Sequence, residues 1–177
     1  STAPENTTIA LDANGDGIID KTLKATPELQ ITFNTNTKNV VLSAQDTIDP
    51  SPSIVTTKSS TTLTNAGGNT TVIPFTQFRE RPTKLVFSYN KIIRNGVTEA
   101  VPNTNIIYAW REEAGILTDL DTKITVRGVE KYVFSYSRRK NTTIIKETTN
   151  AGTVTSTRPG FVVVTIQTER GGLKVTY

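Results

Sequence analysis

Short strand-like segments separated by turn residues run along almost the whole of this 177-residue chain. Leu85, Phe87 and Tyr89 alternate with smaller or more polar residues, a period-two pattern typical of a β-strand with one buried face. Runs of this kind recur about every 8–12 residues between Gly, Pro, Asn and Asp clusters, which is typical of a sandwich. Only residues 111–115 have a helix-friendly composition, and they are too few for a stable helix. We expect an all-β fold, an antiparallel β-sandwich of about 13–15 strands.

Two segments allow more specific predictions. The Asn95-Gly96 pair lies between two apolar runs and predicts a two-residue hairpin turn. Residues 160–168 form the most apolar run of the chain. We expect them to form a central strand buried on both faces.

The stretch 12–20 has the ligand spacing of a calcium loop. Such loops place oxygen ligands at positions 1, 3, 5, 7 and 9 and a glycine at position 6. Gly17 fills the glycine position, and the ligands would be Asp12, Asn14, Asp16, the carbonyl of Ile18, and Asp20. Position 12 is Leu23 rather than the bidentate Glu of an EF-hand, and Pro27 stops any following helix. We therefore expect a Ca²⁺ site on a loop between β-segments.

Because position 12 lacks a carboxylate, another part of the fold would have to donate oxygens, or binding would be weaker. Asp46 and Asp49 are the candidate donors in the loop 46–52. Asp119 and Asp121 form a second candidate pair. Each pair could also form a separate calcium site or consist only of turn-forming residues, since Asp is favoured in turns.

Two resemblances follow from these motifs. The Asp-x-Asn-x-Asp-Gly pattern of residues 12–20 resembles the single calcium loops of dockerins and thrombospondin-type repeats. Residues 28–75 contain Asp-x-x-Asp-Pro-Ser-Pro and then Leu-Thr-Asn-Ala-Gly-Gly-Asn-Thr-Thr, and they look like the small Ig-like repeats of prokaryotic cell-surface proteins. This resemblance implies an Ig-like sandwich. A duplicated loop-helix pair is missing, so cohesin binding is not implied.

The composition excludes most catalytic chemistry. The chain has neither His nor Cys, which excludes Ser-His-Asp triads, cysteine nucleophiles and the usual zinc ligands. Glu112 and Glu113 are adjacent, and neighbours on a strand point to opposite faces, so they cannot flank one glycosidic bond. We expect a protein that is not an enzyme.

Charge and hydropathy bear on partners and location. The net charge is +4, but the cluster Arg138-Arg139-Lys140 lies at an expected turn, where solvated charge is common, so we expect no nucleic-acid binding. The longest apolar run, residues 161–164, is far shorter than the ~18–20 residues that span a bilayer. The small first residue, Ser1, is typical of an end left by signal-peptide removal. We expect a secreted or cell-surface protein without membrane insertion.

The expected organisation has three parts. Residues 1–26 would form an N-terminal arm with the calcium loop, residues 27–78 an Ig-like segment, and residues 79–177 a second sandwich segment, with the last two separate or continuous. Sequons begin at Asn6, Asn69 and Asn141, and they matter only where N-glycosylation occurs.

Two functions remain open. The first is a calcium-stabilised subunit of an extracellular filament, pilus, tube or layer that associates with neighbouring subunits. In such an assembly residues 5–11 or 161–177 would donate a strand. The second is an adhesin or carbohydrate-binding module with a glycan ligand, in which aromatic residues form a stacking platform. The candidates for this platform are Trp110 and the row Tyr132, Phe134 and Tyr136, for which we favour core packing.

Overall fold

The computed structural model describes the backbone of residues 8–11, 21–24, 30–34, 39–44 and 47–48, and the segments 53–64, 70–75, 84–94 and 97–177. Every regular element in these segments is a β-strand, which confirms the predicted all-β class. No helix among them could span a bilayer. The strands are β1 (Thr8–Leu11), β2 (Lys21–Lys24), β3 (Gln30–Asn34), β4 (Asn39–Ala44), β5 (Thr47–Ile48), β6 (Ser53–Thr56), β7 (Ser60–Thr64), β8 (Thr70–Pro74), β9 (Lys84–Arg94), β10 (Val97–Glu113), β11 (Ile116–Val126), β12 (Val129–Ser137), β13 (Thr142–Thr149), β14 (Gly152–Pro159), β15 (Val164–Glu169) and β16 (Gly172–Thr176).

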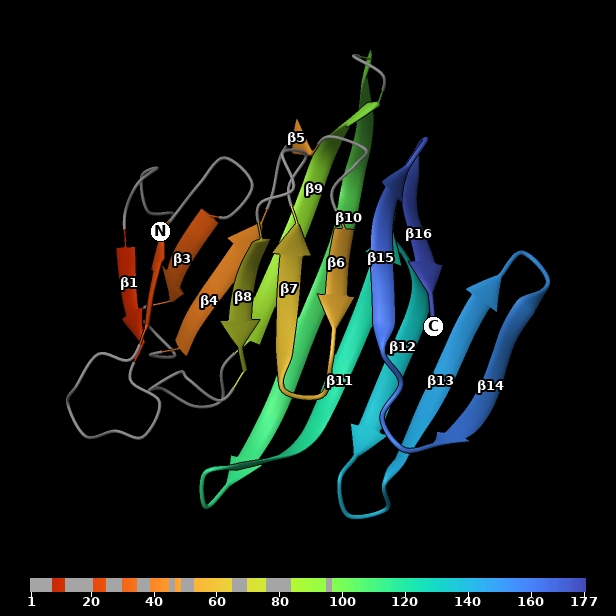
Figure 1. Ribbon diagram of the computed structural model, residues 1–177. Coiled ribbons are helices and arrows are strands. Elements are labelled where there is room, and N and C mark those ends of the chain that lie inside the picture. The colour runs from red at the N-terminus through yellow and green to blue at the C-terminus, as the bar shows by residue number, and fades with distance from the viewer. Residues whose placement is uncertain are drawn as a thin grey trace.

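Most strands belong to two sheets. A nine-stranded large sheet has the order β14-β13-β12-β11-β10-β9-β4-β3, with β5 also paired to β9. A five-stranded small sheet has the order β16-β15-β6-β7-β8. Pairing is antiparallel except where β4 and β5 run parallel to β9. Strands β1 and β2 form a separate hairpin (Figure 1).

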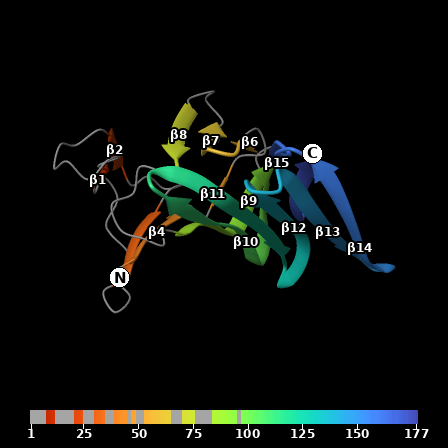
Figure 2. The same cartoon turned by 90° about the horizontal axis from the view of Figure 1, so that it is seen from below.

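The small sheet covers β9 to β12 of the large sheet, so the molecule is a two-layer sandwich (Figures 1 and 2). The inner face of the large sheet is the one turned toward the small sheet, and the outer face is the opposite one. Alternate side chains on β10 and β11 are buried while their neighbours are exposed, as the period-two pattern predicts. The core joins Leu85, Phe87, Ile106, Tyr108, Trp110, Leu120, Ile124 and Phe134 of the large sheet to Ile54, Ile73, Val164 and Ile166 of the small sheet.

The segments 27–78 and 79–177 share both sheets. Strand β6 pairs with β15, from Gln167↔Ser53 to Val164↔Thr56. Strand β4 pairs with β9 in the large sheet. A single core therefore contains residues from both sides of the expected junction.

Hydroxyl groups link the two layers inside the core. The phenol of Tyr108 on β10 is hydrogen-bonded to Oγ1 of Thr56 on β6 at 2.6 Å. Oγ1 of Thr56 is in turn 3.2 Å from Oγ1 of Thr61 on β7. Both threonines are fully buried, so these hydrogen bonds remove the penalty of burying unpaired hydroxyls.

Two-residue connections join β9 to β10 and β10 to β11. Strands β9 and β10 pair from Arg94↔Val97 onward, which confirms the hairpin predicted at Asn95-Gly96, although those two residues lie outside the described part. Ala114-Gly115 connects β10 to β11 with φ values of 50° and 80°, the left-handed pair of a type I′ turn. The helix-friendly stretch thus ends a strand and begins a turn.

The prediction for residues 160–168 is wrong in one respect. Strand β15 begins at Val164 and lies inside the small sheet, between β16 and β6. Its side chains alternate, with Ile166 buried and Gln167 exposed. Only one face is covered because the sandwich has two layers, so the apolar run reflects one buried face and an exposed Val163.

Candidate functional site

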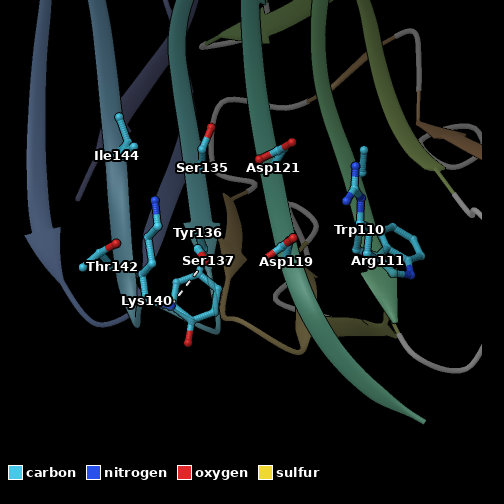
Figure 3. A pocket seen from close by; sticks show the side chains of 11 residues that line it. Trp110, Arg111, Asp119, Asp121, Ser135, Tyr136, Ser137, Lys140, Thr142 and Ile144 are labelled. Atoms are coloured by element: carbon cyan, nitrogen blue, oxygen red, sulfur yellow. Dashed lines mark hydrogen bonds between the residues drawn. The ribbon is translucent and has the colours of Figure 1, made fainter. Parts of the chain in front are cut away.

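The outer face of the large sheet carries a shallow hollow of about 500 Å³ across β10 to β13, the outer hollow, which is lined by charged and hydroxyl residues together with apolar surface (Figure 3). Asp119 and Asp121 project from β11, between Arg111 on β10 and the hydroxyl residues Ser135 and Ser137 on β12. The strand register explains this grouping, because Asp121 lies opposite Ser135 and Asp119 opposite Ser137. Alternate residues of neighbouring strands share a face, so these polar groups meet on the outer face.

The pair Asp119 and Asp121 is thus brought onto one face, as a shared site requires. Two carboxylates and two hydroxyls can bind a cation or the hydroxyl groups of a sugar. Calcium takes six to eight oxygen ligands. Within the segments whose side chains are described, however, no three acidic residues gather as a metal-binding group. The hollow is therefore better suited to hydrogen bonding than to tight metal binding.

The aromatic residues considered as a sugar platform belong mostly to the core. Trp110 is 5% exposed and packs against Phe75 with ring centroids 5.0 Å apart. Phe134 and Tyr136 are also buried. Tyr132 is half-buried and stacks on Phe134 at 5.9 Å. The preference for core packing is confirmed for this row.

Burial also sets the acid–base behaviour of two tyrosines. Desolvation by burial raises the pKa of Tyr108 to about 12, and the hydrogen bonds from Thr56 and Thr61 lower it only in part. Burial, followed by repulsion from Tyr108, raises the pKa of Tyr89 well above its usual range. Both phenols therefore stay neutral at physiological pH.

The C-terminal Tyr177 closes the inner face next to β13. Its ring packs edge-on against Phe134 at 5.2 Å, and the Arg158 guanidinium lies 4.9 Å from the ring centroid. The phenols of Tyr132 and Tyr177 donate to the two carboxylate oxygens of Glu147 at 3.2 and 3.1 Å. Partial desolvation and the Glu147 carboxylate raise the pKa of both phenols.

Beyond Tyr177 the large sheet continues without cover. The hairpin of β13 and β14 projects past the small sheet (Figures 1 and 2). All eight residues of β14 are exposed, including Val154 at 67%. Among the described strands β14 pairs only with β13, so one side of its backbone forms an open edge.

Two backbone hydrogen bonds fix which groups face this open edge. The N–H of Arg138 donates to the carbonyl of Thr118, and the N–H of Gly160 donates to the carbonyl of Asn141. Counting by twos from these bonds along β12, β13 and β14 directs the backbone groups of Val154 and Ser156 toward β13. The N–H and C=O groups of Thr153, Thr155 and Thr157 consequently point outward.

The basic cluster Arg138-Arg139-Lys140 forms the exposed turn between β12 and β13. The N–H of Lys140 donates to Oγ of Ser137 at 3.4 Å, and the turn borders a second hollow that also contains Glu113 and Asp119. Carboxylates among the cations weaken any field that would attract a polyanion. This arrangement is that of a solvated turn.

The predicted ligands Asp12, Asn14, Asp16, Ile18 and Asp20 lie outside the described residues, as do Asp46 and Asp49. The strands on either side of the loop are described: β1 ends at Leu11, β2 begins at Lys21, and these two residues pair. The loop thus connects two paired strands, and the calcium site stays a prediction.

Glu112 and Glu113 lie at the end of β10. Asn6 and Asn69 are outside the described part, and Asn141 is exposed with a φ of 48°.

Strand β14 (Gly152–Pro159) was not among the strands expected from the sequence. Its residues follow a turn and contain three threonines and a valine in alternation, a composition favoured in strands. Polar side chains on both faces hid it, because strand prediction from periodicity depends on a buried apolar face.

Comparison of the chain with protein-family models, curated proteins and solved structures gave no match.

Proposed function

We propose that this chain is a non-enzymatic structural subunit of an extracellular filament, pilus, tube or layer, held together by strand pairing between neighbours and stabilised by calcium. The observation that carries the proposal is the open edge of β14, the longest of the sheet edges among the described strands. An exposed strand edge is a template for a strand from another chain.

Strand β14 has few of the devices that protect sheet edges. Natural edges are shielded by bulges, lysines, prolines or covering loops. The pairing of β13 with β14 runs without a register shift from Thr142↔Pro159 to Thr149↔Gly152. Arg158 and Pro159 stand at one end, and the other six residues carry no charge. Such an edge favours association with another chain over a monomeric state.

The outer hollow supports a structural rather than a catalytic role for this chain. Its carboxylates and hydroxyls lie on the open outer face (Figure 3). Water competes there for each hydrogen bond and screens each charge. Catalysis by preorganised polar groups generally depends on a water-excluded site.

Calcium would stabilise the hairpin of β1 and β2. A two-stranded hairpin is marginally stable alone, and this one pairs with neither large nor small sheet. An ion held by Asp12, Asn14, Asp16, Ile18 and Asp20 would tie its two strands together. Of the expected donor segments, residues 164–169 and 172–176 already pair within their own sheet, whereas β1 pairs with β2 alone among the described strands.

Electron microscopy and light scattering on concentrated protein test the proposal. We expect ordered particles in calcium, fewer in a chelator, and fewer in calcium for the variant Asp12→Asn/Asp16→Asn. The variant Asp119→Asn/Asp121→Asn is the matched control and should assemble like the wild type. Protein that stays monomeric at all concentrations with and without calcium would overturn the proposal.

The second candidate is a carbohydrate-binding module, favoured by the hydroxyl and carboxylate groups of the outer hollow. Because Trp110 is buried, the informative variants are Asp121→Ala and Ser135→Ala rather than a substitution of Trp110. Glycan-array binding that both variants abolish, from a protein that remains monomeric, would favour this candidate over the first.

A further inference from the structure

The open edge of β14 has a self-complementary chemistry. Its outward backbone groups belong to Thr153, Thr155 and Thr157, and the side chains of these residues share the outer face. We propose that the partner of this edge is β14 of a second copy, paired antiparallel about a two-fold axis between the two Thr155 residues. This inference rests on the proposed function, because it names the partner of the same edge. A two-fold pair closes on itself, so growth from the dimer into a filament or layer requires a second contact elsewhere on the subunit.

Strand length singles out a second β14 among the edges that the structure describes. Strand β14 has eight residues. The edge strands β3, β8 and β16 have five each, and β1 and β2 have four each. Only another β14 can pair along the full open edge. The hairpin of β13 and β14 projects past the small sheet (Figure 1), so a strand that pairs with β14 meets it away from the small sheet.

The direction of the backbone groups fixes the register. Outward residues must face outward residues to exchange hydrogen bonds, so odd-numbered residues pair with odd-numbered ones. With Thr155 opposite Thr155, Thr153 lies opposite Thr157, and every outward N–H and C=O of these threonines is used in about six hydrogen bonds. A shift by two residues in one direction would place Pro159, which has no N–H to donate, opposite Thr153. The same shift in the other direction would place Thr157 opposite Ala151, which lies outside β14.

The side chains agree with this register. On the outer face it creates Thr–Thr pairs, which are favourable across strands. The chain already contains a Thr–Thr pair of this kind, in which Oγ1 of Thr148 is hydrogen-bonded to Oγ1 of Thr153 at 3.0 Å. The one charged residue of β14, Arg158, would face Gly152 of the other copy rather than another arginine, so no like charges oppose each other.

Cysteine cross-linking tests the register directly, because the chain has no cysteine. Hydrogen-bonded partners have Cα atoms about 5.5 Å apart, a separation that a disulfide spans. In a glutathione redox buffer, Thr155→Cys should form a disulfide-linked dimer. Thr153→Cys and Thr157→Cys should each stay monomeric alone but cross-link when mixed. Thr153→Cys that cross-links alone as fast as the mixture would overturn the inference.

A second variant tests the pairing without a cross-link. Thr155→Pro removes an N–H that points away from β13, so its melting temperature as a monomer should match the wild type. It removes two of the donors in the dimer, and the dissociation constant measured by sedimentation should rise about tenfold or more. An unchanged dissociation constant would overturn the inference. The two claims can fail separately. If the Thr155→Cys variant forms ordered particles while its introduced thiol stays reduced, the β14–β14 pairing is wrong and the proposed function stands. If it forms cross-linked dimers that never grow larger, the pairing stands and the proposed function is wrong.

Discussion

Replacing Tyr108 by phenylalanine removes the hydroxyl that links the two layers of the sandwich. The phenol is fully buried and lies 2.6 Å from Oγ1 of Thr56. A buried hydrogen bond contributes about 0.5–1.5 kcal/mol net, and an unsatisfied buried partner costs about 1–3 kcal/mol. Thr56 keeps its contact with Thr61, so we expect Tyr108→Phe to lower the free energy of unfolding by about 1–2 kcal/mol.

Urea unfolding, followed by the fluorescence of the one tryptophan, gives this free energy. The m-value should not change, because the variant exposes the same surface on unfolding. Tyr132→Phe is the matched control, since its half-buried phenol donates to Glu147, where water can replace the bond. We expect the control to change stability by less than about 0.5 kcal/mol.

A double-mutant cycle then isolates the link between the sheets. Thr56→Val keeps the shape of the side chain and removes its hydroxyl. Thr61, which loses its contact with Thr56, keeps its bond to the carbonyl of Val55 at 3.5 Å. Once Tyr108 and Thr56 have both lost their hydroxyls, neither leaves the other unpaired, so the double variant should cost about 1 kcal/mol less than the sum of the single variants. Strict additivity, or a Tyr108→Phe variant as mild as the control, would refute the account of this cluster.

Three further predictions concern pH, a turn and calcium. The pKa of Tyr108 is about 12 in the folded state against 10.0 unfolded, so between these pH values the unfolded chain binds fewer protons and stability falls. Tyr108 should account for about 2–3 kcal/mol of the loss in alkaline unfolding curves, which Tyr108→Phe removes, and Tyr89, whose pKa burial also raises, should account for a further loss that stays in this variant. Ala114 has a φ of 50°, and Ala114→Asn should raise the free energy of unfolding by about 0.5–1 kcal/mol, because asparagine tolerates this conformation; no gain in urea unfolding would contradict the assigned turn. Calcium at 100 times its dissociation constant should add about 2.7 kcal/mol and raise the melting temperature by about 5–10 °C in calorimetry. This shift should vanish in Asp12→Asn/Asp16→Asn, and its absence from the wild type would remove the predicted site.

The strands with one buried face were the ones that the sequence predicted well. Leu85 and Phe87 alternate with residues of the other face, and both are fully buried. The row Tyr132, Phe134 and Tyr136 shares the inner face for the same reason. In these strands apolar residues recur at every second position because one face is buried, so the strands can be recognised from the sequence without a structure.

Strand β14 and the turn at Ala114 could not be predicted in the same way. Val154 is the one apolar side chain of β14 and it is exposed, so no buried face marks this strand. Ala114 takes a left-handed conformation that its residue type does not favour, because the pairing of β10 with β11 fixes the turn. The outer hollow depends on register across four strands, β10 to β13, which local periodicity does not contain.

Amide hydrogen exchange along β14 tests the central claim most directly. In dilute protein the outward amides of Thr153, Thr155 and Thr157 should exchange rapidly, whereas those of Val154 and Ser156, bonded to β13, should be protected. In assembled protein all five should be protected. If the three threonine amides exchange as rapidly in the assembly as in the monomer, the open edge of β14 is not where the subunits join.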